Sequence, residues 1–415
     1  MVIEAISSWY VKNFAYKRFV INKDGIKAPS NPDNNKKYLM YIHIPFCEEL
    51  CPYCTFNRIY FKEELAREYF KIIEKEILIY KKQGYQFDSV YVGGGTPTVL
   101  PAELVRVLQF IKELWSIKQI SVETNPNHLT PEILELLNDA GVNRLSVGVQ
   151  TFNDPLLQSM GRYVKYGSGA QTRERLKSAM GIFDTLNVDI IFNFPDQTLE
   201  MLIEDLEILK EIGPEQITCY PLMGQDGRDS EDPLGGRRES LKREKLFYRT
   251  IVNMLKKDYK PVTVWCFSRK RGSIDEYIVE YDEYAGTGAG SFSYIKGKLY
   301  SNTCSVERYI DYLQRGESPV VAGRTLMMSE RARYDLLMRL FGKSLDLEIM
   351  KEKYGKGYWI YLWKELLLLF LTGAVRKEGS KLLLRPFAYY PMVVLMRDFF
   401  TGVNNLREIS SSFSS

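Results

Sequence analysis

The stretch YIHIPFCEELCPYCTF, residues 41–56, decides both the fold and the chemistry that the sequence predicts. It places Cys47, Cys51 and Cys54 in the spacing CxxxCxxC, directly after a strand-like run. Three thiolates can bind three irons of a [4Fe–4S] cluster and leave the fourth iron open to another ligand. A structural zinc site is the alternative, but zinc would need a fourth Cys or His, and His43 belongs to the alternating strand pattern.

Strand-like and helix-like segments alternate around this motif. The strand-like segments are 38–46, 89–97, 119–126, 143–152, 188–195 and 215–223. Helical spacing of apolar residues falls at 62–83, 101–115, 131–139, 171–186 and 198–211. This alternation predicts an α/β fold with a partial or full parallel (β/α) barrel. The active site of such a fold lies at the carboxyl ends of the strands.

The pattern changes on either side of this barrel. Residues 1–38 are expected to form an N-terminal extension, and residues 39–242 the core barrel, which closes with a polar, glycine-rich loop. Residues 243–415 are expected to form a C-terminal α+β, mainly helical domain that covers the substrate. In that part, a helix at 243–257 precedes glycine-punctuated strands near 284–302.

Composition limits the function classes. The chain has 56 Lys and Arg against 52 Asp and Glu, which is too even a balance to favour nucleic-acid binding. Outside the motif, Cys219, Cys266 and Cys304 are widely spaced and are expected to be buried thiols of a protein in a reducing, cytoplasmic compartment. The apolar run Leu366–Leu371 is too short to span a bilayer. We expect a buried helix there, with peripheral contact to the inner face of the membrane as the alternative.

Five further motifs make the sequence resemble one branch of the radical S-adenosylmethionine (SAM) superfamily. In order, they are GGGTP (93–97), ETNP (123–126), RLSVGVQTF (144–152), Arg162 and VDIIFNFP (188–195). This branch contains oxygen-independent coproporphyrinogen oxidases, haem chaperones and class C radical SAM methyltransferases. The resemblance implies a radical SAM enzyme with a [4Fe–4S] cluster on the three cysteines, and an electron donor such as flavodoxin or ferredoxin.

The resemblance also implies that two SAM molecules bind side by side. Residues that match the first SAM site are Tyr41, Gly94 and Glu123. Residues that match the second are Tyr53, Gly95, Thr96, Gln150, Arg162 and Asp189. Glycines let a backbone approach a ligand, carboxylates suit ribose hydroxyls, and an arginine can bind the methionine carboxylate. Plainer readings stay open: a tight turn at Gly93–Gly95, rim salt bridges at the two carboxylates, and a strand end capped by Gln150.

Two departures guide the choice of substrate. Phe56 stands where decarboxylating coproporphyrinogen oxidases usually carry a further cysteine, and the second half of the chain has no histidine to bind haem. Segments 265–294 and 396–408 look most similar to menaquinone C8-methyltransferases. The expected function is therefore class C methyl transfer, with two SAM molecules, to an sp² carbon of the menaquinone ring. The alternatives are a coproporphyrinogen oxidase-like or other tetrapyrrole-modifying enzyme, and a haem chaperone.

The aromatic content, with 28 Tyr, 21 Phe and 5 Trp, suits a flat, apolar small-molecule substrate. Candidates to line its site are Trp265, Phe267, Tyr294, Phe399 and Phe400. For each one, ordinary core packing is the more common role. The sequence assigns no catalytic base, although Asp282, Glu283 and Tyr284 lie in a suitable segment.

Overall fold

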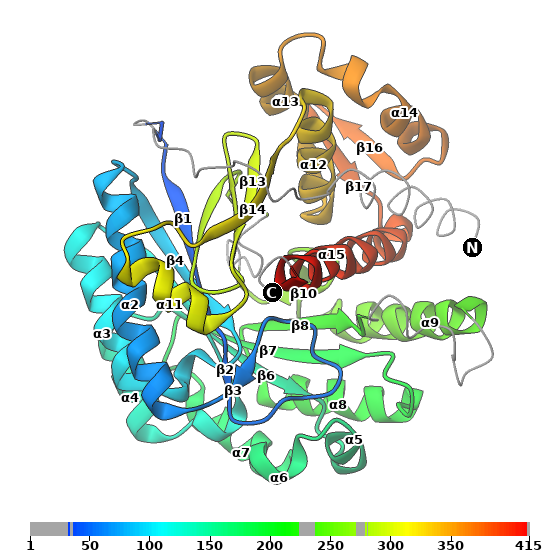
Figure 1. Ribbon diagram of the computed structural model, residues 1–415. Coiled ribbons are helices and arrows are strands. Elements are labelled where there is room, and N and C mark those ends of the chain that lie inside the picture. Colours follow the sequence, from blue (N-terminus) through cyan, green and yellow to red (C-terminus); the bar gives the residue numbers. More distant parts are fainter. Residues whose placement is uncertain (1–31, 34–35, 224–236, 271–278, 280, 413–415) are drawn as a thin grey trace.

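The computed structural model describes residues 32–33, 36–223, 237–270, 279 and 281–412 (Figure 1). Most of the expected N-terminal extension and of the loop after the barrel lies outside these residues. Side chains are described up to residue 403 of the last helix.

Six parallel strands form the centre of the main sheet, and their order in the sheet follows their order in the chain. They are β1 (Tyr38–Ile44), β4 (Phe87–Gly94), β5 (Gln119–Thr124), β6 (Arg144–Gln150), β7 (Thr185–Phe192) and β8 (Gln216–Pro221). Near-continuous burial of these strands reflects a sheet that is covered on both faces. The sheet stays open at both ends, so the expected parallel barrel is a partial one.

Helices that connect these strands pack along the outer face of the sheet (Figure 1). They are α2 (Glu63–Lys82), α3 (Pro101–Leu114), α4 (Pro131–Asp139), α5 (Asp154–Ser159), α6 (Tyr163–Tyr166), α7 (Gly169–Ala179) and α8 (Leu199–Ile212), with short 3₁₀ turns at Pro97–Val99 and Pro126–His128. The helix expected at 171–186 ends at Ala179. Gly181 takes a φ of 78°, which breaks the helix, and β7 begins at Thr185.

The second half of the chain extends the same sheet on both sides. The added strands are β9 (Lys260–Pro261), β10 (Cys266–Ser268), β11 (Tyr284–Thr287), β12 (Phe292–Ile295), β13 (Lys298–Asn302) and β14 (Val320–Thr325). β10 pairs antiparallel with β8, and β11 pairs parallel with β1. Strands from both sides of residue 242 thus share one sheet, and the division into domains there stays a prediction.

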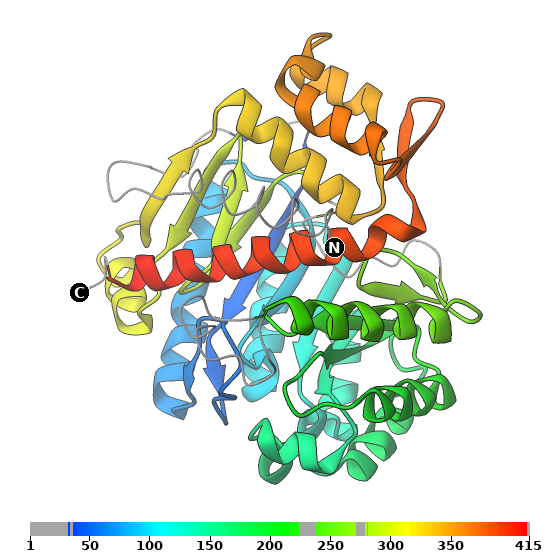
Figure 2. The ribbon, with the colours of Figure 1, turned by 90° about the vertical axis from the view of Figure 1, so that its right-hand side faces the viewer.

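Two of the remaining helices pack against the outer helices α2 and α8, and the others lie over the other face of the sheet and at its end. They are α9 (Arg237–Leu255), α11 (Val306–Gln314), α12 (Met328–Phe341), α13 (Leu347–Tyr354), α14 (Tyr358–Leu371) and α15 (Tyr389–Ser412), with a 3₁₀ turn at Pro386–Ala388. A small sheet of β15 (Ser344–Asp346), β17 (Lys381–Leu384) and β16 (Val375–Glu378) joins α13 and α14. In Figure 2, α15 runs in front of the strands of the main sheet.

The run Leu366–Leu371, expected to be buried, lies in α14 and is largely exposed. Leu367 is 50% exposed and Leu371 is 77% exposed. Among the described residues, no helix is both long and apolar enough to cross a membrane.

Candidate active site

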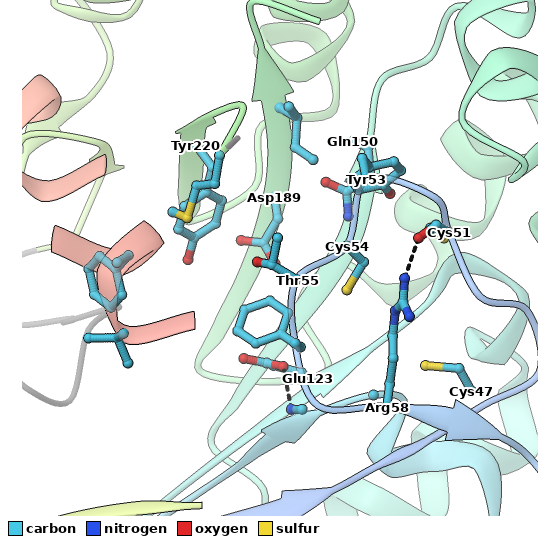
Figure 3. A pocket seen from close by; sticks show the side chains of 18 of the residues that line it. Cys47, Cys51, Tyr53, Cys54, Thr55, Arg58, Glu123, Gln150, Asp189 and Tyr220 are labelled. Atoms are coloured by element: carbon cyan, nitrogen blue, oxygen red, sulfur yellow. Dashed lines mark hydrogen bonds between the residues drawn. The ribbon is translucent and has the colours of Figure 1, made fainter. Parts of the chain in front are cut away.

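All three cysteines of the CxxxCxxC motif line one pocket of about 320 Å³ at the carboxyl ends of the parallel strands (Figure 3). Cys47 ends a two-residue strand, β2 (Phe46–Cys47), and the loop that carries Cys51 and Cys54 leads to β3 (Ile59–Tyr60). The backbone N–H of Cys54 donates to the carbonyl of Cys51 (3.1 Å). None of the three thiols is in a disulfide.

The arrangement of these thiols fits a cluster better than a single metal ion. Within the described part of the chain, no three His, Cys, Asp or Glu side chains lie close enough to hold one ion. In a four-iron cluster each thiolate binds a different iron, so three cysteines around a shared pocket suit that group. Burial raises the pKa of the Cys47 thiol to about 12, so its thiolate form needs a cationic partner such as iron.

His43 does not complete a zinc site. Its Nδ1 accepts from the Tyr41 hydroxyl (2.9 Å), and its Nε2 donates to the Asn57 carbonyl (2.8 Å). Both ring nitrogens are therefore engaged. The hydrogen bonds place His43 in support of the loop and not among the metal ligands.

Glu48, inside the motif, fixes the first part of the loop to the barrel. Its carboxylate accepts from His128 Nε2 (3.1 Å) and Asn127 Nδ2 (2.9 Å) and pairs with Lys165 Nζ (2.8 Å). The bond from His128, together with the other two partners, lowers the pKa of Glu48 to about 2. Glu48 is therefore a loop anchor, which sequence reasoning did not identify.

Asn57 and Arg58, which follow the motif in the sequence, hold the other end of the cysteine loop. The Asn57 amide donates to the carbonyl of Ala289 (3.1 Å) and to that of Cys304 (3.0 Å), both in the second half of the chain. Arg58 donates to the carbonyl of Cys51. Sequence reasoning missed both residues, although their position directly after the motif was a signal that could have found them.

Residues expected at the first SAM site lie together on three adjacent strands. Tyr41, Gly94 and Glu123 all line the pocket. Glu123 accepts from the Tyr91 hydroxyl (2.8 Å) and from the backbone N–H of Gly94 (3.1 Å), so its carboxylate is fixed at the strand ends.

The glycines of GGGTP are required by close packing, and not only by a turn. Gly94 has a φ of 116°, and a Cβ there would lie 2.7 Å from the ring of His43. A Cβ on Gly95 would lie 2.6 Å from the carbonyl oxygen of Phe46. The segment runs along β1 and β2, where the Gly95 N–H donates to Ile44 and the Thr96 N–H to Phe46 (both 2.7 Å). Small residues thus let the cluster loop and β4 approach each other.

Five of the six residues expected at the second SAM site also line the pocket: Tyr53, Gly95, Gln150, Arg162 and Asp189. Thr96 is the exception. It is buried behind Cys47, where its hydroxyl lies 3.7 Å from the sulfur and accepts from the Asn125 amide (2.8 Å). Asp189 accepts from the hydroxyl of Ser146 (2.9 Å) and from the amide of Asn187 (2.7 Å).

Arg162 is anchored at the cysteine loop. Its guanidinium donates to the carbonyl of Gly148 (2.6 Å), to Asn125 Oδ1 (2.9 Å) and, at 3.5 Å, to the sulfur of Cys51. It also lies over the ring of Tyr166, 4.1 Å from the centroid. These contacts hold the Arg162 guanidinium beside the sulfur of Cys51.

Gln150 has a strained backbone, with a φ of 73° at a bulge in β6. The next two residues are held by Asp205, whose carboxylate accepts from the Thr151 hydroxyl (2.8 Å) and the Phe152 N–H (2.7 Å). Burial raises the pKa of Asp205 to about 7. A non-glycine residue in this region is uncommon and persists where its surroundings fix it. Asp205 therefore helps to present Gln150 to the pocket.

The opposite end of the pocket is aromatic. It is lined by Trp265, directly before β10, by Tyr294 from β12, by Tyr334 from α12, and by Phe399 and Phe400 from α15. The rings pack on one another, with centroids 4.7 Å apart for Tyr294–Tyr334 and 5.6 Å apart for Trp265–Phe400.

Four of the five aromatic candidates thus reach the pocket. Phe267 does not line it and is buried in β10, as ordinary core packing predicts. Of the candidate bases, Tyr284 lines the pocket. Asp282 pairs with Arg339 and Lys353 (2.5 and 3.1 Å), and Glu283 pairs with Lys36 (3.2 Å). Phe56 also lines the pocket and is 49% exposed.

Comparison with known proteins agrees with this geometry. The sequence model of the Radical SAM superfamily matches residues 41–209. The heme chaperone HemW of Bacillus subtilis is 30% identical over 333 residues, covering 76% of this chain and 87% of the relative. The oxygen-independent coproporphyrinogen III oxidase of Helicobacter pylori is 25% identical over 379 residues, covering 83% of this chain and 82% of the relative.

Among solved structures, the coproporphyrinogen III oxidase HemN of Escherichia coli has the same fold. Its TM-score is 0.75 at 21% identity, over 92% of this chain and 94% of that chain. A parallel partial barrel with a three-cysteine loop at its strand ends defines the radical SAM class. The chain belongs to the radical SAM superfamily, in the branch that contains HemW heme chaperones and oxygen-independent coproporphyrinogen III oxidases.

These comparisons correct the expected function. The expectation of a class C methyltransferase acting on menaquinone is wrong, because the relatives found are heme chaperones and coproporphyrinogen III oxidases. The expectation rested on the resemblance of segments 265–294 and 396–408 to menaquinone C8-methyltransferases and on two features that discriminate weakly between members of the branch. A missing cysteine at Phe56 and a missing histidine in the second half separate members of the branch poorly, since tyrosine and cysteine can also ligate haem iron.

Proposed function

We propose that this chain is a radical SAM enzyme that acts on a tetrapyrrole, in the manner of the coproporphyrinogen oxidase-like members of its branch. One observation carries the proposal: the cysteine loop and the aromatic wall open into the same pocket. Flat aromatic surfaces suit a flat ring substrate, and the cysteines suit a cluster beside it. The names of the relatives support this substrate class.

Cys47, Cys51 and Cys54 would hold the [4Fe–4S] cluster, with Arg162 beside Cys51. When bound, the cluster would supply one electron to SAM, whose cleavage yields a 5′-deoxyadenosyl radical that takes hydrogen from the substrate. The chain's own residues would bind and orient. Glu123, fixed by Tyr91 and Gly94, would accept hydrogen bonds from ribose hydroxyls.

A second SAM molecule is part of the proposal. Tyr53, Gly95, Gln150, Arg162 and Asp189 lie around the pocket beside the residues of the first site. Thr96 would act through Cys47 and Asn125, since its side chain does not line the pocket. The tetrapyrrole would pack against the aromatic end, where its ring excludes water from the reacting atoms. A flavodoxin- or ferredoxin-type electron donor and a cytoplasmic location stay predictions.

The test is an anaerobic assay of reconstituted protein with reductant, SAM and coproporphyrinogen III. We expect 5′-deoxyadenosine to form and the mass of the tetrapyrrole to change, and we expect neither in Cys51→Ala. Cleavage of SAM that is indifferent to every tetrapyrrole offered would contradict the proposed substrate class.

A second candidate function is haem carriage, which the identity to HemW relatives favours. The same pocket offers the phenols of Tyr220, Tyr284 and Tyr334 near the aromatic end, and tyrosine can ligate haem iron. A haem absorption band that stays with the protein through gel filtration, without SAM-dependent change of the haem, would support this candidate over catalysis.

A further inference from the structure

The helix α14 (Tyr358–Leu371), with the sequence YWIYLWKELLLLFL, exposes a large apolar face. The exposed members are Trp359 (56%), Ile360 (59%), Trp363 (52%), Leu367 (50%), Leu368 (39%), Phe370 (49%) and Leu371 (77%), and we refer to them as the α14 face. Their spacing of three and four residues puts them on one side of the helix. A contiguous exposed apolar patch of this kind marks an interaction surface.

The opposite side of α14 is firmly packed, so the α14 face is held outward. Leu362 is fully buried, and the buried Glu365 pairs with Arg333 of α12 (2.6 Å). Further apolar side chains, Leu366 and Leu369, pack against the core. A helix that is apolar all round is expected inside a protein or in contact with lipid. Here one side meets the protein and the other meets solvent.

Basic residues gather around this face. Residues 347–388 contain eight Lys and Arg against four Glu, an excess equal to the formal net charge of +4 of the whole chain. One of the four Glu is the buried Glu365, which is paired with Arg333, and three of the eight cations are themselves in ion pairs: Lys351 with Glu348, Lys353 with Asp335 and Arg376 with Glu378. Exposed cations stand on the helix and on the hairpin β16–β17 that follows it, at Lys364, Lys377 and Lys381. Figure 1 shows this hairpin beside α14.

Tryptophan, leucine and phenylalanine bordered by lysine and arginine match the surface of a bilayer with anionic lipids. Tryptophan prefers the level of the headgroups, and lysine is drawn to lipid phosphates. The length of α14 excludes a spanning role, because 14 residues extend about 21 Å and the hydrocarbon core is about 30 Å thick. A helix of this kind would lie in the plane of the interface.

We propose that the α14 face docks this protein on an anionic phospholipid surface, with α14 in the plane of the headgroups. The docking surface is separate from the pocket, since none of the α14 side chains lines it. The docking proposal therefore does not depend on the proposed substrate.

The experiment is flotation of the full chain with vesicles of phosphatidylcholine alone, or of phosphatidylcholine mixed with phosphatidylglycerol. We expect binding to the mixed vesicles that weakens at least about tenfold on neutral vesicles or at high salt, because screening removes the attraction of the lysines. Brominated lipids should quench the tryptophan fluorescence of a Trp9→Phe chain, in which Trp359 and Trp363 are exposed whereas Trp115 and Trp265 are buried.

Two variants separate docking from misfolding. Trp359→Ser/Trp363→Ser/Leu367→Ser should lower vesicle binding at least about tenfold, because it removes much of the apolar area that would leave water. Trp359→Phe/Trp363→Phe, made in the Trp9→Phe chain, should still bind and should lose the quenching. Leu246→Ser, at an exposed leucine on α9 (49%), is the matched control and should bind as the parent does.

The proposal is overturned if the full chain does not bind anionic vesicles, or if the triple serine variant binds them as well as the parent does. It is also overturned if the parent is a dimer that this variant splits, because the α14 face would then be an interface between two copies.

Discussion

Different interactions hold the two ends of the pocket in place. The cysteine end consists of polar groups from the first half of the chain, each tied by hydrogen bonds, as Glu48 is by three partners. The aromatic end consists of rings from the second half, which pack on one another across several elements. Single changes should therefore act sharply at the cysteine end and gradually at the aromatic end.

The largest effect is expected for Cys51→Ala. Two thiolates hold a cluster poorly, so we predict loss of bound iron and sulfide and of all SAM cleavage after reconstitution. Iron and sulfide analysis checks this. The matched control is Cys219→Ala, at a buried thiol away from the pocket, which should keep a full cluster. Normal iron content in Cys51→Ala would disprove the ligand assignment.

Next in size is a pH effect at Asp205. Its folded pKa of about 7 exceeds the value of about 3.9 in an unfolded chain, so the native state binds more protons between these values. Stability should fall as pH rises from about 4 to about 7, by at most about 4 kcal/mol, and then level off.

In Asp205→Asn this pH-dependent part of the free energy of unfolding should vanish, while the bond from the Phe152 N–H can remain. Urea unfolding of both proteins across that pH range measures the difference. Parallel curves for the two proteins would show that Asp205 does not carry the dependence.

Asn57→Ala should have an intermediate effect. It leaves the carbonyls of Ala289 and Cys304 without this donor, which should cost about 2 kcal/mol of folding free energy and speed the loss of iron to a chelator. Asn127→Ala is the control, because Glu48 keeps two other partners. Equal rates of iron release in both variants would show that the hydrogen bonds of Asn57 do not stabilise the cysteine loop.

The smallest effect is predicted at the aromatic end. Phe400→Ala removes one ring of several, so we expect substrate binding to weaken about tenfold, with cluster content and the pH dependence of stability unchanged. Titration with the tetrapyrrole and iron analysis test both parts. Loss of the cluster in this variant would mean that the two ends are not separate.

The same contrast explains what could be predicted from the sequence. The six parallel strands follow from the alternation of strand-like and helix-like segments, and the cluster site follows from the spacing of the three cysteines. The nine SAM residues came from the resemblance to a known family, and eight of them line the pocket. Thr96 does not, because in the turn after β4 its hydroxyl faces the sulfur of Cys47. The sequence pattern does not distinguish aromatic residues that line the pocket from those that pack in the core. Phe267 and Phe400 look alike in the sequence, but only Phe400 lines the pocket.

Local sequence patterns also gave wrong predictions for one helix end and for the burial of one apolar run, because tertiary contacts determine both. The sequence predicts a helix up to residue 186, because the residues after Ala179 keep an apolar pattern across Gly181, whereas α7 ends at Ala179. The run Leu366–Leu371 was expected inside because apolar residues usually are. Sequence shows that such a helix is apolar on all sides and does not show which side the rest of the chain covers.

The central claim, that both ends of the pocket serve one reaction, is tested most directly by isotope transfer. Coproporphyrinogen III with deuterium on its side chains is incubated with reconstituted protein, SAM and reductant, and the 5′-deoxyadenosine is analysed by mass spectrometry. The account predicts deuterium in the deoxyadenosine. Deoxyadenosine without deuterium, formed while the tetrapyrrole stays bound and unchanged, would contradict it.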